Sequence, residues 1–457
     1  MIVLRDMSIF VTDITSWQSL KKRIMKKSYP YKIVLSFFFM IFLVIQLHAQ
    51  DNLKVILAGN MIDVVEGEIR KNVLIIIDNN KIVEITSADK KAEYPHLIDL
   101  SEYTVLPGLI DCHTHLTDNT YDKSYDVYEL PIASYGIIGT INAKKTLNAG
   151  FTTVRDLGGW FYSDVALRDA INKNWIPGPR MYVSGAYLTM TGGHGAWGNW
   201  MSPQIELKQN PGAIADGESA MRKQARLHIK NNVNLIKIMA TGGFGTSESI
   251  PGASSFTTEE MKAAVEEAVK RGLKVAAHAH GSDGIKNAIR AGVNSIEHGT
   301  FLDQECIDLM KKYNVYLIMD LLAAHYDLIE AKSDYSDKQL GDKTNREIYK
   351  DIEIKFNEAY SQKVKMTFGT DAGVYPHGQN ARQFKLMKNA GMKSIDILKS
   401  STITAAELIG IEKSTGSIEI GKWADIIAVK GNPLKDIQLL ENIHFVMKDG
   451  KVYKHIK

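Results

Sequence analysis

Two histidines at the end of an apolar segment give the first chemical signal in the chain. The segment runs from Thr104 to Leu116 with strand character and carries His113 and His115 on either side of one threonine. Because side chains alternate between the two faces of a strand, both imidazoles project to the same side. Neutral imidazoles are common ligands of divalent metal ions, so this pair predicts half of a metal site. The same spacing also occurs in ordinary loops, so the prediction depends on further ligands.

Further residues with ligand chemistry stand at or near the ends of other apolar segments. In chain order they are Lys237, His278, His298 and Asp371. Taken singly, each histidine is compatible with a buried structural role, and the aspartate with a turn or a helix cap. The lysine is harder to explain in that way, because an ammonium group on a covered strand needs an anionic partner. Reaction of its amine with carbon dioxide would give a carbamate, an anionic ligand whose two oxygens can bridge two cations.

The elements that must position these residues are eight apolar segments that alternate with helical patterns. Their ranges are 104–115, 152–156, 180–185, 234–240, 274–280, 295–299, 315–320 and 366–371. A capping box of Thr257 and Glu260 opens one clear amphipathic helix, which Gly272 ends. The alternation predicts an α/β fold, a (β/α)8 TIM barrel, whose chemistry lies at the carboxyl ends of the strands. A doubly wound parallel sheet is the alternative.

Two connections between these segments are longer than a barrel needs. They are residues 187–217, which follow the third segment, and residues 326–360, which follow the seventh. Long loops at strand ends are usually pocket walls or lids, and we predict that role for both. A solvated helical excursion is the alternative for 326–360.

Both flanks of the chain have shorter strands and tight turns. Two apolar runs, 73–77 and 81–85, surround an Asp-Asn-Asn sequence, which is typical of a β-hairpin. Residues 413–457 have the same character. We therefore expect a small β-sandwich domain built from 50–105 and 413–457, and a barrel domain of residues 106–412.

Residues 1–49 have the pattern of an N-terminal extension followed by a secretory signal segment. Two lysines precede an apolar run from Ile33 to Ile45, and the small residue Ala49 stands before polar sequence. The run is short for a helix that spans a membrane. We expect a secreted or periplasmic protein without stable membrane insertion, and an uncleaved N-terminal anchor is the alternative.

Composition excludes some classes of protein. The chain has 457 residues, of which 45% are hydrophobic and 23% charged, with a formal net charge of +3. This length suits one large domain and one small one. The near-balanced charge gives no electrostatic case for a nucleic-acid partner. Two cysteines, Cys112 and Cys306, cannot form a disulfide framework, and we expect free thiols. A homo-oligomer stays open.

Taken together, these motifs resemble those of the amidohydrolase superfamily, in its binuclear subtype with a carboxylated lysine. In that family, barrel strands one, four, five, six and eight supply His-x-His, Lys, His, His and Asp. The resemblance extends to the group of Xaa-Pro and Xaa-basic dipeptidases and ochratoxin amidases, related to the imidazolonepropionases, in four strings: 235–243, 278–281, 296–299 and 369–372. Imidazolonepropionases usually lack the bridging lysine, so Lys237 argues against that branch. The resemblance covers about residues 52 to 450.

The resemblance implies a metal-dependent hydrolase of amide bonds with two divalent ions. Imidazole and carboxylate ligands suit zinc, with manganese or cobalt as alternatives. The implied ligands are His113, His115 and Asp371 for the first ion, and His278 and His298 for the second. Lys237, carboxylated by carbon dioxide, would bridge the two ions and so belong to the catalytic machinery. Asp371 would take a proton from a bridging hydroxide and deliver it to the leaving nitrogen.

Substrate contacts are less determined by the sequence. Candidates on the same strand faces or on the loops that follow are His280, His194, Tyr187, Arg155 and His377. His280 could equally orient another ligand, and Arg155 could pair with Asp156 or Glu297. We expect a small-molecule substrate, either a dipeptide or an N-acyl amino acid with a free carboxylate.

Other functions stay open at this point. The same machinery could act on a lactam, a lactone or ester, or a phosphotriester, or as an imidazolonepropionase-like cyclic amidase. An inactive binding scaffold is the least favoured function, because such proteins typically lose metal ligands and here none is missing.

Overall fold

A computed structural model describes residues 53–120, 130–196, 198–199, 201–202, 204, 212–244, 246, 249–330 and 344–456. Residues from Lys54 onward form one compact unit. In the described part of the chain, no helix is long and apolar enough to cross a membrane. The predicted extension and signal segment, residues 1–49, lies outside the described residues, so export stays a prediction.

Both ends of the chain contribute to one seven-stranded sheet, in the order β16-β15-β14-β4-β1-β2-β3. Its strands are β1 (Leu53–Asp63), β2 (Glu68–Asp78), β3 (Lys81–Ser87), β4 (Leu97–Pro107), β14 (Ile426–Val429), β15 (Phe445–Lys448) and β16 (Lys451–His455). The two ends join where β14 pairs antiparallel with β4. The predicted hairpin is confirmed, because Asp78 of β2 pairs with Lys81 of β3 across a two-residue turn. The expectation of a β-rich unit from both termini is therefore correct.

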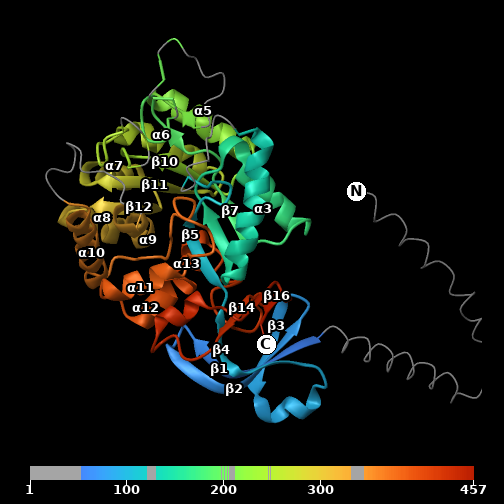
Figure 1. Cartoon of the computed structure of the whole chain (residues 1–457). Helices are drawn as coiled ribbons and strands as arrows, with labels where there is room; N and C mark the ends of the chain where they lie inside the picture. Colours follow the sequence, from blue (N-terminus) through green and yellow to red (C-terminus); the bar gives the residue numbers. More distant parts are fainter. Residues whose placement is uncertain are drawn as a thin grey trace, which may run out of the picture. The chain divides into compact units, whose positions relative to one another are not determined.

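The middle of the chain forms the predicted (β/α)8 barrel (Figure 1). Its named strands are β5 (Leu109–Thr114), β6 (Phe151–Asp156), β7 (Arg180–Val183), β10 (Leu235–Met239), β11 (Lys274–Gly281), β12 (Ser295–Phe301) and β13 (Tyr316–Ile318). Neighbouring pairs run parallel from β5 to β7 and from β10 to β13. The amide of Asn234 donates to the carbonyl of Val183 at 2.8 Å, which connects these two groups of strands.

The eighth position of the barrel is an extended segment, residues 366–371, without the full pairing of a strand. Met366 forms a parallel bridge to Leu317 of β13. On the other side, the amide of Cys112 in β5 donates to the carbonyl of Phe368 at 2.9 Å. The segment therefore closes the barrel between β13 and β5, and it places Asp371 beside the end of β5.

The structure corrects one predicted strand. The segment 104–115 is two strands, because β4 ends at Pro107 in the seven-stranded sheet and β5 begins at Leu109 in the barrel. Gly108 lies between them, and a Cβ atom there would come within 2.2 Å of the Thr152 hydroxyl oxygen. Only glycine permits this approach, so the chain passes from one sheet to the other at that residue.

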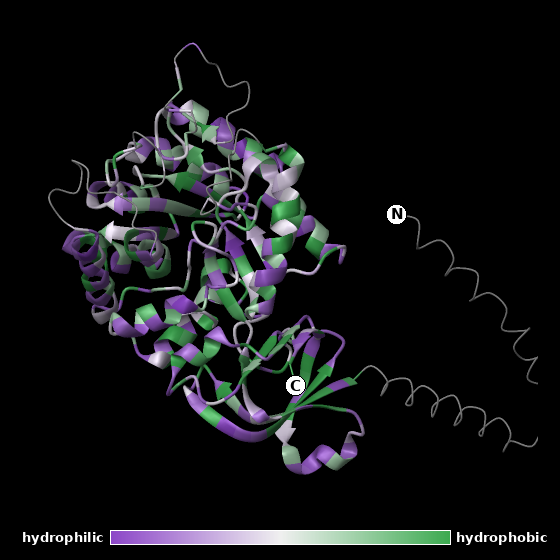
Figure 2. Ribbon diagram, in the orientation of Figure 1, coloured by the Kyte–Doolittle hydropathy of each residue, from purple (hydrophilic) through white to green (hydrophobic). Residues whose placement is uncertain are grey.

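Helices surround the barrel strands. They are α3 (Ile132–Asn148), α4 (Ser163–Asn172), α5 (Gly217–Lys230), α6 (Thr258–Val269), α7 (Ser282–Ala291), α8 (Gln304–Tyr313), α9 (Leu321–His325), α10 (Asn345–Ser361), α11 (Arg382–Asn389), α12 (Ser394–Ser400) and α13 (Ile403–Ile409). Along these helices hydrophobic and hydrophilic residues alternate (Figure 2). The capping box of α6 is confirmed, with the amide of Glu260 3.2 Å from the Thr257 hydroxyl.

The two long connections differ in structure. The described part of 187–217 contains two short strands, β8 (Leu188–Thr189) and β9 (Ala213–Ile214). The described part of 326–360 begins with one π-helical turn (Tyr326–Glu330) and continues in α10. Residues 345–361 are helical, but α10 is not a solvated excursion, because it buries Ile348, Ile352 and Phe356. Tyr326 and Ile352 line the cavity described below, so the described part of this stretch forms pocket wall as predicted.

Candidate metal centre

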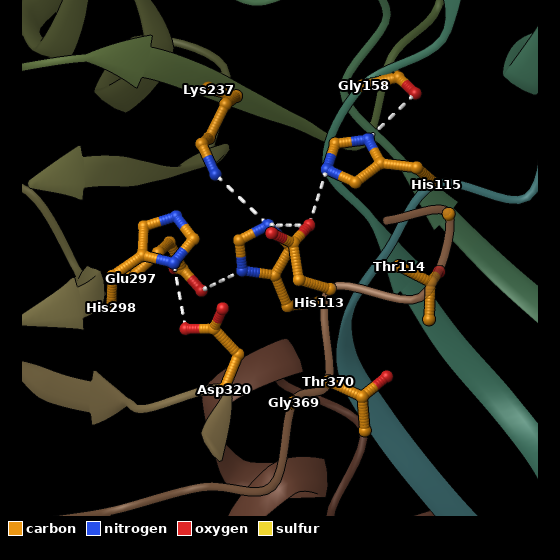
Figure 3. A network of polar contacts seen from close by, with 12 residues as sticks. His113, Thr114, His115, Gly158, Lys237, Glu297, His298, Asp320, Gly369 and Thr370 are labelled. Carbon is orange, nitrogen blue, oxygen red and sulfur yellow. Dashed lines mark hydrogen bonds and ion pairs between the residues drawn. The ribbon is translucent and has the colours of Figure 1, made fainter. Parts of the chain in front are cut away.

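The predicted ligands meet at the carboxyl ends of the barrel strands. His113, His115, Lys237, His278, His298 and Asp371 all line one cavity of about 640 Å³. They come from β5 and the residue that follows it, from β10, β11 and β12, and from the eighth segment, so side chains far apart in the sequence converge on one cavity. Figure 3 shows four of them, His113, His115, Lys237 and His298. The barrel fold itself produces this convergence, because all its parallel strands end on the same face.

The first group of ligand atoms comes from the first barrel strand, β5, with the residue that follows it, and from the eighth segment, residues 366–371. The Nε2 atoms of His113 and His115 lie 3.3 Å and 3.1 Å from Oδ1 of Asp371. The Nζ atom of Lys237 lies 3.4 Å from Nε2 of His113. Ligand atoms of the two histidines and the aspartate lie within 4.8 Å of one another, close enough to hold one metal ion.

A second group consists of three imidazoles. Ligand atoms of His278, His280 and His298 also lie within 4.8 Å of one another. His298 Nδ1 lies 2.8 Å from Oδ1 of Asp320, and ligand atoms of these two residues and of Asp371 form a third such group. The two main groups are thus adjacent, and the site has the donors for two ions.

Burial and neighbouring charges together set the pKa values of the groups in the cavity. It lowers the pKa of Lys237 to about 8, so the neutral amine is accessible near physiological pH. Burial, assisted by the nearby lysine, lowers the pKa of His113 to about 4, which leaves this imidazole neutral. For His115 burial acts downward, but the Asp371 carboxylate outweighs it and raises the pKa to about 9. Although burial opposes its charge, His113 and His115 hold the pKa of Asp371 well below its usual range.

Two of the ligands have an unusual backbone conformation. His298 and Asp371 have φ angles of 71° and 56°, in the left-handed region that L-residues rarely adopt. Such conformations cost roughly 1–3 kcal/mol and persist where the surrounding structure imposes them. Each residue follows strand-like backbone, so the change in φ turns its side chain at the point where the ligands meet.

The donor set fits divalent metal ions of the zinc type. Imidazole nitrogens and a carboxylate oxygen are the ligands that zinc prefers, and the first group supplies both kinds. Each histidine of the first group has an oxygen beside its Nδ1 atom: Glu297 Oε2 at 3.2 Å for His113, and the Gly158 carbonyl at 3.2 Å for His115. Oxygen acceptors at Nδ1 leave Nε2 for a metal, which is the usual arrangement around metal-bound histidines.

Three of the predicted substrate residues line the same cavity, namely His194, Tyr187 and His280. The ring of His194 stacks on that of His278, with centroids 4.4 Å apart, and its Nδ1 lies 2.9 Å from the Thr246 hydroxyl. His280 Nδ1 lies 2.7 Å from the Thr300 hydroxyl. These contacts fix His194 beside the second ligand group and His280 within it, and both imidazoles face the cavity.

The structure places Arg155 and His377, two of the predicted substrate contacts, outside the cavity lining. Both are buried. The Arg155 guanidinium donates to Glu297 Oε1 at 2.7 Å, which is one of the two alternatives left open from the sequence. His377 Nε2 lies 3.2 Å from the Asp118 carbonyl oxygen, behind the cavity wall. Protein groups thus satisfy the Arg155 guanidinium.

Sequence reasoning missed some residues that line the cavity, above all Asp320 and Phe244. Asp320 is the last residue of the predicted segment 315–320, so the rule that strand ends carry the chemistry could have identified it. Phe244 packs edge-on against His280, with centroids 4.9 Å apart. It lies in a loop after β10, where no sequence pattern indicated an inward direction.

Comparisons with known proteins agree with this geometry. The sequence model of the amidohydrolase family matches residues 104–453. Ochratoxinase from Aspergillus niger is 30% identical over 416 residues, which span 85% of this chain and 84% of that protein.

Solved structures show the same likeness. A Xaa-Pro dipeptidase with methionine bound in its active site superposes with a TM-score of 0.81 at 37% identity, over 88% of this chain and 100% of that one. A prolidase in complex with N-methylphosphonate-L-proline superposes with a TM-score of 0.77 at 26% identity, with the same coverage of 88% and 100%.

Proposed function

Because the chain belongs to the amidohydrolase family, we propose that it hydrolyses the amide bond of dipeptides or N-acyl amino acids. Its family makes it a hydrolase that acts on carbon–nitrogen bonds. The similarity to a Xaa-Pro dipeptidase and to a prolidase supports the dipeptide class of substrate. The observation that carries the proposal is the meeting of two ligand groups and the buried Lys237 in one cavity.

In this proposal the two ligand groups hold two divalent ions. The first ion is assigned to His113, His115 and Asp371, and the second to His278 and His298. Lys237 stands beside His113 with a lowered pKa, and its neutral amine is the form that reacts with carbon dioxide to give a bridging carbamate. Two divalent ions held by these residues would supply a nucleophilic water at neutral pH and polarise the substrate carbonyl.

Asp371 is the residue that moves the proton. Contact with the His115 imidazole, whose pKa is raised, holds its carboxylate in place and keeps it ionised, so it is ready to accept a proton from the attacking water. The same carboxyl group then delivers that proton to the leaving nitrogen. General acid–base help of this kind contributes about 10² to 10⁴ in rate.

The remaining cavity residues are assigned to the substrate. His194 and Tyr187 are placed to donate to the carbonyl oxygen, whose negative charge grows in the transition state. His280, held by Thr300, is assigned to the free carboxylate of the substrate. A cavity of about 640 Å³ suits a molecule of dipeptide size, since small-ligand pockets typically measure about 300–1,000 Å³.

The test is amine release from a panel of dipeptides and N-acyl amino acids by protein supplied with zinc and bicarbonate. We expect release from substrates with a free carboxylate and much less from the same substrates after C-terminal amidation. His280→Asn should narrow that difference, while Glu305→Gln, a change on the exposed surface of α8, serves as the matched control. Protein that binds zinc but releases no amine from any member of the panel would contradict the proposed substrate class.

A further inference from the structure

Glu297, the residue next to His298 in β12, lies on the side of His113 that faces away from the cavity. It is fully buried, and its Oε2 atom is 3.2 Å from His113 Nδ1. Figure 3 shows that Glu297 and Lys237 approach opposite nitrogens of the same ring. A carboxylate in contact with a proposed metal ligand, yet outside the cavity lining, needs an explanation that the proposed reaction does not provide.

The contact determines which nitrogen of His113 is available to a metal ion. Nδ1 of His113 and Oε2 of Glu297 face each other, and neither of these buried atoms has another hydrogen-bond partner among the described residues. An ionised carboxylate has no proton to donate, so the proton of a neutral His113 imidazole belongs on Nδ1, the nitrogen that faces Glu297. The other nitrogen, Nε2, then has its lone pair directed at Lys237 and Asp371. A neutral imidazole with this tautomer is the form that binds a metal.

A buried carboxylate needs compensation, and Arg155 supplies it. The guanidinium donates to Glu297 Oε1 at 2.7 Å, and the Ser295 hydroxyl donates to the same oxygen at 2.6 Å. Arg155 also donates to the Ser295 hydroxyl at 2.9 Å and to the backbone carbonyl of Cys112 at 2.6 Å. Because Cys112 directly precedes His113, one arginine holds both the backbone before the ligand and the carboxylate on its ring.

We propose that Arg155 and Glu297 form a positioning pair that fixes the tautomer and orientation of His113 for metal binding. The pair connects β5, β6 and β12, so it ties three strands together beneath the ligands. The inference rests on the metal site of the proposed function, although it does not depend on the substrate. Loss of an outer partner of a metal-bound histidine typically weakens metal affinity by roughly 10–100-fold.

The experiment measures zinc affinity by competition with a chelator, with zinc content determined by elemental analysis. The variant is Arg155→Met combined with Glu297→Gln, which removes both charges and leaves no unpaired buried ion. A glutamine amide can present a donor or an acceptor to Nδ1, so the tautomer is no longer fixed. We expect the affinity to fall by roughly 10–100-fold. Affinity equal to that of the wild type would overturn the proposal.

Arg180→Met is the matched control, because Arg180 also pairs with carboxylates, Asp425 and Asp449, but outside the cavity. It should lower thermal stability and leave zinc affinity unchanged. Equal losses of affinity in the control and in the double variant would show a merely structural role and reject the pair. Ser295→Ala, which removes one donor to Glu297, gives a milder test should the double variant not fold: we expect several-fold weaker zinc binding, and no change would count against the pair.

Failure of the positioning pair can be distinguished from failure of the proposed function. Wild-type protein that binds no zinc would remove the metal site itself. Wild-type protein that binds zinc but cleaves no amide would leave the positioning pair testable, because the readout is affinity and not turnover.

Discussion

Arg155 and Arg180 lie on neighbouring barrel strands, and both donate to carboxylates, but at opposite ends of those strands. Arg155 is near the carboxyl end of β6, where it pairs with Glu297 beneath the ligands. Arg180 opens β7, where it pairs with Asp425 and Asp449 at 2.8 Å and 2.6 Å. The same side chain thus serves two different purposes according to its place along the strand.

The two carboxylates that pair with Arg180 lie at strands of the seven-stranded sheet. Asp425 directly precedes β14, and Asp449 lies in the turn between β15 and β16. The guanidinium also stacks on the ring of Trp423, 3.9 Å from its centroid. In a barrel of this type the carboxyl face carries the chemistry and the amino face carries stability. The comparison predicts that changes at the two ends affect different measurements.

The largest effect is expected at the carboxyl end, from Asp371→Asn. An amide cannot accept the proton from the attacking water, so kcat should fall by about 10² to 10⁴. Zinc content measured in the same preparation separates loss of the base from loss of an ion. Turnover at the wild-type level with both ions bound would remove Asp371 from the proton transfer.

At the amino end, Arg180→Met should reduce stability and spare the zinc site. The change leaves the buried Asp425 carboxylate without its charged partner, and breaking a buried pair in this way costs about 3 kcal/mol or more. Denaturant unfolding of the metal-free protein measures the loss. A variant as stable as the wild type would show that the stability of the protein does not depend on this ion pair with the seven-stranded sheet.

The pH dependence of metal loading sharpens the account of Lys237. Its pKa is lowered to about 8, and only the neutral amine reacts with carbon dioxide, so the reactive fraction rises as pH increases through that value. At constant dissolved carbon dioxide, loading of metal-free protein with zinc should be roughly tenfold faster at pH 9 than at pH 7. A rate that is independent of pH over this range would show that lysine carbamation does not limit loading.

The smallest effect is expected at an exposed position outside the cavity lining, at the capping box of α6. Thr257→Ala removes the hydroxyl that accepts from the Glu260 amide, at a cost of about 1 kcal/mol. Thermal unfolding should register this loss, while zinc affinity and turnover stay at wild-type values. A change in zinc affinity in this variant would show that any loss of stability also weakens metal binding. Zinc affinity would then no longer distinguish the carboxyl end of the barrel from its amino end.

Sequence reasoning identified the barrel strands because they are apolar segments that alternate with helical patterns, and five of them carry a residue with ligand chemistry at or near their end. It could not identify the break at Gly108, since that depends on how closely Thr152 approaches in space. The left-handed backbone at His298 and Asp371 is likewise imposed by neighbouring strands and leaves no local signature.

The direction of Arg155 shows the same limit. Strand periodicity assigns a residue to a face, but it does not say whether a long side chain reaches the cavity or a buried partner such as Glu297. The clustering of ligands could be predicted because it follows from topology. The network that holds those ligands could not, because it depends on packing between strands far apart in the sequence.

Zinc content and amide hydrolysis measured together in wild-type protein and in Lys237→Ala test the central claim most directly. We expect two zinc ions per chain and amine release in the wild type, and loss of bound zinc and of turnover in the variant. Glu305→Gln, purified in parallel, controls for handling. Wild-type turnover in Lys237→Ala would contradict the bridging lysine and, with it, the metal centre proposed here.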